Sequence, residues 1–81
     1  MSHVPHELPE MLGMDAHAIT TWAESDAHIA RQVEEYHTLN RAIHRAETDV
    51  EPTSDDHLHA MKRDRLALLD ALRAAQATAD A

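Results

Sequence analysis

The chain has 81 residues, with 7 basic residues against 15 acidic ones, and its formal net charge is −8 at neutral pH. Domains usually contain roughly 100–200 residues, so this length fits one small domain without a second catalytic domain. The acidic balance excludes the clustered lysine and arginine that nucleic acid binding needs. The lack of cysteine excludes disulfides and thiolate metal sites. Alanine supplies 15 of the 35 apolar residues, which leaves few large side chains for a core.

Residues 1–14 are expected to form an arm with a short helical turn. Pro9 suits the first turn of a helix, and Gly13 interrupts the helix after Leu12. The arm lacks the cationic and apolar regions of a secretory signal, and no stretch approaches the ~20 apolar residues of a membrane span. We therefore expect a cytoplasmic protein with no membrane partner.

Residues 15–48 are predicted to form the first long helical arm. Asp15 can cap its start, and Ser25-Asp26 supplies a second cap signal, so the helix is either continuous or bent near residue 25. Apolar residues then recur at seven-residue intervals, with others between them. They are Trp22, Ile29, Val33, Tyr36, Leu39, Ile43, Ala46 and Val50. This period predicts a helix with one apolar stripe.

A turn is predicted over residues 49–53, because Pro52 lacks a backbone N–H and disfavours helical backbone in the residue before it. Thr53 or Ser54 can cap a second helix over residues 54–76, and residues 77–81 are expected to fray. Arg65 interrupts the apolar stripe of this helix. The stripe consists of Leu58, Met61, Leu68, Leu69, Leu72 and Ala75.

These elements predict a single all-α domain, an antiparallel helical hairpin of coiled-coil character with a short N-terminal helix or arm. Two helices bury one seam between them. We therefore expect a second copy of the chain, most simply in a dimer, or a larger cytoplasmic protein to complete a helical bundle. The apolar contacts expected in the seam are Trp22, Ile29, Val33, Tyr36, Leu39, Ile43, Leu58, Met61, Leu68 and Leu72.

Polar residues also border the two stripes, and we expect specificity contacts among them. The candidates are Glu35, His37, Asn40, His44, Arg45 and Arg65. For Asn40 and Arg65 two interpretations stay open. A polar residue in a seam can fix register and oligomeric state, or it can lie at the edge with its polar end in water.

Several segments resemble one known family. They include Ser25-Asp26-Ala27-His28-Ile29-Ala30, Glu35-Tyr36-His37-Thr38-Leu39-Asn40 and Ile43-His44-Arg45-Ala46-Glu47. Over roughly residues 1–73 the chain resembles the YdcH-like small bacterial proteins, catalogued as domain of unknown function 465. The resemblance implies a short cytoplasmic helical hairpin with no established enzymatic activity, and it carries over no catalytic residue. The segment from His57 to Asp64 is poorer in lysine than the family pattern, and the tail is richer in alanine.

Eight histidines are the one compositional oddity that suggests chemistry. His37 and His44 are seven residues apart, and His57 and His59 are two apart. No pair has the i, i+4 spacing around a carboxylate that characterises helical zinc sites. We therefore predict no metal site and no cofactor. We also predict no enzymatic activity, because no glycine-rich elbow accompanies the serines and threonines that could act as nucleophiles. The alternative hypothesis is a regulatory protein whose histidines respond to metal or to pH.

Overall fold

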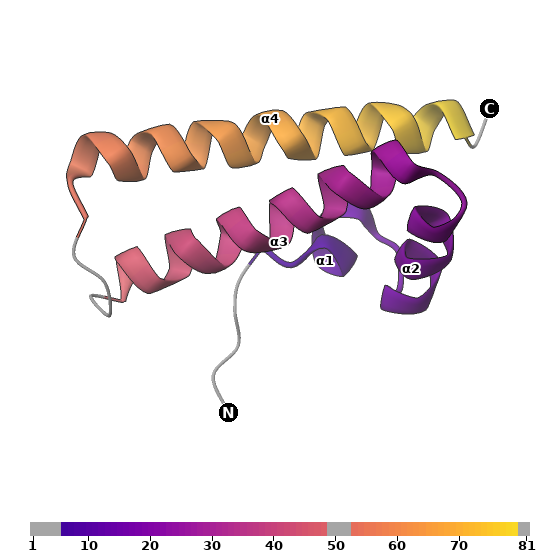
Figure 1. Ribbon diagram of the computed structural model, residues 1–81, viewed down its shortest axis with the longest axis horizontal. Helices are drawn as coiled ribbons and strands as arrows, with labels where there is room; N and C mark the ends of the chain where they lie inside the picture. The colour runs from indigo at the N-terminus through magenta and orange to yellow at the C-terminus, as the bar shows by residue number, and fades with distance from the viewer. Residues whose placement is uncertain (1–5, 49–52, 80–81) are drawn as a thin grey trace.

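The computed structural model describes residues 6–48 and 53–79, and they form four α-helices. These are α1 (Leu8–Leu12), α2 (Ala16–Glu24), α3 (Ala27–Glu47) and α4 (Asp55–Ala79). The long helices α3 and α4 pack antiparallel as a hairpin, which confirms the predicted all-α architecture (Figure 1). The short helix α2 lies at the end of the hairpin where α3 begins and α4 ends, and α1 lies between α2 and the middle of α3 (Figure 1).

Side-chain caps set the starts of α2, α3 and α4. The Asp15 carboxylate accepts a hydrogen bond from the backbone N–H of Ala18 at 2.8 Å. The Asp26 carboxylate accepts from His28 and Ile29 at 3.0 and 3.3 Å, and the Ser54 hydroxyl accepts from His57 at 3.1 Å. Each bond satisfies an N–H group that has no partner inside its own helix. The first long helical arm is therefore interrupted between α2 and α3. Ser54 is the residue that caps α4.

Helix α4 ends at Ala79, three residues beyond the predicted helix end at residue 76. Alanine, the best helix former, is frequent in this last stretch, and the Thr78 hydroxyl donates a hydrogen bond to the Ala74 carbonyl at 3.0 Å. Of the predicted turn at 49–53, residues 49–52 lie outside the described residues, as does Val50 of the first stripe.

The N-terminal segment contributes directly to the core. Leu8 and Leu12 of α1 are buried together with Tyr36 of α3 and with Leu69 and Leu72 of α4. The helix ends at Gly13, whose φ of 65° lies in the left-handed region where glycine has no steric penalty. One end of the seam is therefore covered by the chain's own first helix.

Hydrogen bonds from both long helices hold α1 in place. The Tyr36 hydroxyl donates to the His6 carbonyl at 2.6 Å. At the other end of α1, Arg73 and Gln76 of α4 donate to the carbonyls of Met11 and Leu12 at 3.1 and 2.9 Å. The last carbonyls of a helix have no partner within that helix, so these side chains supply one. Within residues 6–48 and 53–79, no helix combines the length and apolarity that a membrane span requires.

Candidate interaction surface

The central residues of the predicted contact surface are part of the protein's own hydrophobic core. Ile29, Tyr36, Ile43 and Leu72 are buried in the chain's own core. Burial also raises the pKa of the Tyr36 hydroxyl above its ordinary value. These four side chains therefore stabilise the hairpin in this conformation and are not presented to a partner.

A polar pair crosses the seam at its centre. The guanidinium of Arg65 on α4 donates a hydrogen bond to the side-chain oxygen of Asn40 on α3 at 2.9 Å. Asn40 is 1% exposed and Arg65 is half-buried. Because the bond joins residues on the two long helices, a shift of α3 along α4 would break it. Of the two interpretations of these residues, the geometry supports a role in setting the hairpin register.

The remaining apolar residues of the predicted surface are only half-buried. They come from α2, α3 and α4 and are Trp22, Val33, Leu39, Leu58, Met61 and Leu68. On another side of α4, Leu66 is 56% exposed. These side chains keep some area that a partner can reach, although Trp22, Val33 and Leu68 also pack against the chain's own core.

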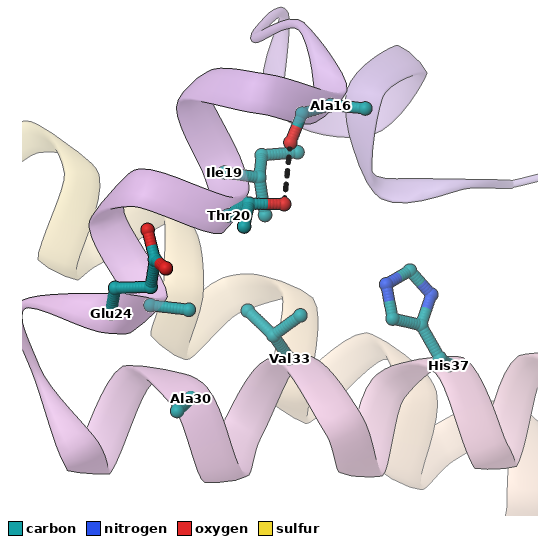
Figure 2. Close-up of a pocket in the computed structure, with 8 residues that line it drawn as sticks. Ala16, Ile19, Thr20, Glu24, Ala30, Val33 and His37 are labelled. Atoms are coloured by element: carbon teal, nitrogen blue, oxygen red, sulfur yellow. Dashed lines mark hydrogen bonds between the residues drawn. The ribbon is translucent and has the colours of Figure 1, made fainter.

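An open groove of about 500 Å³ runs between α2 and α3. Figure 2 shows Val33 pointing from α3 toward α2, with Ile19 above it and His37 farther along α3. The Thr20 hydroxyl donates to the Ala16 carbonyl at 3.0 Å within α2, so its polar atom is already bonded. The groove is therefore largely apolar, and charged or titratable side chains lie only at Glu24 and His37.

A second hollow, of about 390 Å³, lies on α3 alone and includes Thr38 and Leu39. The groove residues Ala30, Val33 and His37 occupy a different side of α3. Leu39 is therefore accessible without any movement of α2. The charged residues around this hollow are Arg31, Glu34 and Glu35.

The predicted polar contacts occupy different environments. Glu35 is exposed, whereas His37, His44 and Arg45 are half-buried. His37 Nδ1 lies 3.6 Å from a carboxylate oxygen of Glu7, a contact that becomes an ion pair when the imidazole is protonated. Over residues 6–48 and 53–79 the structure brings together no group of three or more histidine, aspartate or glutamate side chains that could hold a metal ion.

Lys62 and Glu47 join the two long helices near the end of the hairpin that α1 and α2 leave uncovered. The ammonium of Lys62 lies 2.7 Å from a carboxylate oxygen of Glu47, and both side chains are substantially exposed. This hydrogen bond lowers the pKa of the Glu47 carboxyl below its ordinary value. A carboxyl with a lowered folded-state pKa stabilises the protein above its unfolded pKa, and that contribution is lost as the pH falls.

Replacing Lys62 with methionine should raise the pKa of Glu47 toward its ordinary value, which an NMR titration of the carboxyl carbon can measure. Because the pair is exposed, we expect the free energy of unfolding at neutral pH to fall by less than about 1 kcal/mol. The difference in stability between the two proteins should shrink as Glu47 becomes protonated. The exposed Arg63, replaced in the same way, is the control, and an unchanged Glu47 titration in the Lys62 variant would contradict the assignment.

The residues that dock α1 against the hairpin were not predicted from the sequence. Leu8 and Leu12 have the i, i+4 spacing of one helix face, and Pro9 and Gly13 mark the two ends of that helix, so a signal for a short amphipathic helix was present. Arg73 and Gln76 carry no comparable signal, because nothing in the local sequence distinguishes them from solvent-facing residues. Only the fold shows that they reach the carbonyls of α1.

Fold and surface together define a small antiparallel helical hairpin whose seam is closed at one end by its own N-terminal helices. Residues 29–75 match the family described as protein of unknown function (DUF465), and the chain belongs to this family. No curated protein and no solved structure matches the chain. The matched residues cover most of α3 and α4, so α1 and α2 lie outside the match.

Proposed function

We propose that this chain is a non-enzymatic helical-hairpin protein that acts by binding other protein chains, in the first instance a second copy of itself. The observation that carries the proposal is the half-buried apolar stripe along α3 and α4. Leu39, Leu58, Met61 and Leu68 are all partly open to solvent. Covering such side chains removes apolar surface from water, which is the main driving force of protein association.

The charge of the chain bears on how strongly copies associate. A net charge of −8 repels a second copy, and protonation of the eight histidines reduces that repulsion as the pH falls. The proposal therefore includes stronger self-association at mildly acidic pH than at neutral pH. The second partner that we propose is a larger cytoplasmic protein, which would cover the same apolar stripe with an apolar helix face of its own.

Sedimentation equilibrium tests the proposal by comparing the wild-type chain with Met61→Glu. The wild-type chain should associate as its concentration rises through the micromolar range, and a charge at Met61 should weaken that association at least about tenfold, because it would have to be buried without a partner. Leu66→Glu is the matched control, since Leu66 lies on another side of the same helix and is more exposed. Circular dichroism establishes that both variants remain folded.

Two outcomes would contradict the proposal. The first is a wild-type chain that stays monomeric throughout that concentration range. The second is an equal effect of Met61→Glu and Leu66→Glu, which would show that the apolar stripe has no special part in association.

A further inference from the structure

The connection between α2 and α3 depends on the backbone of a single residue. Ser25 already lies in the helical region, with φ −91° and ψ −4°. Asp26 alone is extended, with φ −150° and ψ 107°. No proline or glycine occurs between residues 15 and 48. A change of Asp26 to helical backbone would therefore join α2 and α3 into one continuous helix over residues 16–47.

Hydrogen bonds within the turn help to hold the bend. The Asp26 carboxylate accepts the two hydrogen bonds that begin α3, and the Ser25 hydroxyl donates to the Trp22 carbonyl at 2.9 Å. Between α2 and α3, by contrast, lies the open groove of about 500 Å³ (Figure 2). The caps at the hinge act together with Ile19 of α2, which is 5% exposed and lies in one core with Ile29 of α3, to keep α2 folded against α3.

Straightening at Asp26 would carry α1 away from its own hairpin. Leu8 and Leu12 would leave their contacts with Tyr36, Leu69 and Leu72. A helix of five residues does not persist alone in water, so the released segment regains its structure only by docking again. The binding site that it vacates is complementary to this same segment.

We infer that residues 6–25 can exchange between two copies of this chain, with Asp26 as the hinge and the vacated seam of each copy as the binding site for the other's α1. The exchanged dimer makes every α1 contact that the closed chain makes, including those donated by Arg73 and Gln76. Such reciprocal exchange is a low-cost route to a dimer. The inference rests on the proposed self-association and gives it a specific means, exchange of residues 6–25, to which the apolar stripe of α3 and α4 adds further contact between the two copies.

The first test is Asp26→Ala, which removes both cap bonds at the hinge and introduces the residue that best favours continuous helix. We expect at least a tenfold tighter dimer by sedimentation equilibrium, with helix content retained. The matched control is Asp15→Ala, which removes the equivalent cap of α2 without altering the hinge. It should leave the dimerisation constant unchanged.

The second test is Ala27→Pro, which works in the opposite direction. Proline is tolerated at the first position of a helix such as α3 but breaks a helix in its interior, and it holds the preceding Asp26 in extended backbone. This variant should fold as the closed monomer and should fail to dimerise at concentrations where Asp26→Ala is dimeric. If Asp26→Ala does not fold, Ala27→Pro is compared with the wild-type chain instead. Weaker dimerisation of Ala27→Pro than of the wild type would then support exchange.

A chain labelled at Glu10→Cys on α1 and His59→Cys near the start of α4 reports exchange by energy transfer. Straightening at Asp26 places residue 10 up to about 24 Å beyond the start of α3, at the end of the hairpin far from residue 59. In dimers formed with excess unlabelled Asp26→Ala chain, exchange therefore separates the two labels and transfer falls. Dimers that retain full transfer, an Asp26→Ala chain that stays folded and monomeric, or a dimeric Ala27→Pro chain would each overturn the inference. The last of these would leave the proposed self-association standing, because copies would then meet through another surface.

Discussion

Replacing Leu8 with alanine is expected to lower the free energy of unfolding by about 2–5 kcal/mol, the usual cost of a fully buried leucine. Leu8 is 0% exposed and packs in the core with Tyr36 and Leu72. The change removes its methyl groups and leaves a space that a helix anchored at both ends fills poorly. Urea unfolding followed by circular dichroism measures the loss, and the slope of the transition shows whether the folded state stays compact.

Leu66→Ala is the control for this experiment. It makes the same chemical change on α4, where the side chain is 56% exposed, and should alter stability by no more than about 0.5 kcal/mol. A loss at Leu8 as small as that at Leu66 would mean that α1 contributes nothing to the core. The N-terminal segment would then be an arm, as the sequence suggests.

The features that could be predicted from the sequence are those set by local interactions. The seven-residue series through Ile29, Tyr36 and Ile43 predicts a buried helix face, because the helical period places these residues on one side. Asp15, Asp26 and Ser54 were identifiable as caps, since a cap bonds to backbone two or three residues away. The two long helices and the hairpin follow from these signals.

Docking of α1 could not be predicted in the same way, because it joins residues far apart in the chain. Leu8 and Leu12 meet Leu69 and Leu72 across some sixty residues, and a five-residue helix is too short for periodicity to reveal its partner. The apolar pattern likewise shows that the seam must be covered, but it does not identify the segment or the partner that covers it. Part of the predicted surface is consequently core, and the residues that remain partly accessible are Trp22, Val33, Leu39, Leu58, Met61 and Leu68.

The hydrogen bond between Arg65 and Asn40 leads to the second large expected effect. Asn40→Leu should lower the free energy of unfolding by about 1–3 kcal/mol, because the half-buried guanidinium loses the oxygen that it bonds at 2.9 Å. Replacing both partners, as Asn40→Leu with Arg65→Met, should recover most of that loss, since apolar side chains of similar size need no partner.

A double-mutant cycle of these variants, measured by urea unfolding, gives the coupling energy of the pair, which we expect to be about 1 kcal/mol or more. Additive losses at the two positions would show that the bond contributes nothing to the hairpin. Crosslinking between cysteines placed on α3 and α4 reports the alignment of the two helices. It therefore distinguishes an effect of the polar pair on register from its effect on stability. If the doubly apolar hairpin is stable but forms crosslinks in more than one alignment, the polar pair serves to select one alignment of the helices, at a cost in stability that an apolar seam would not have.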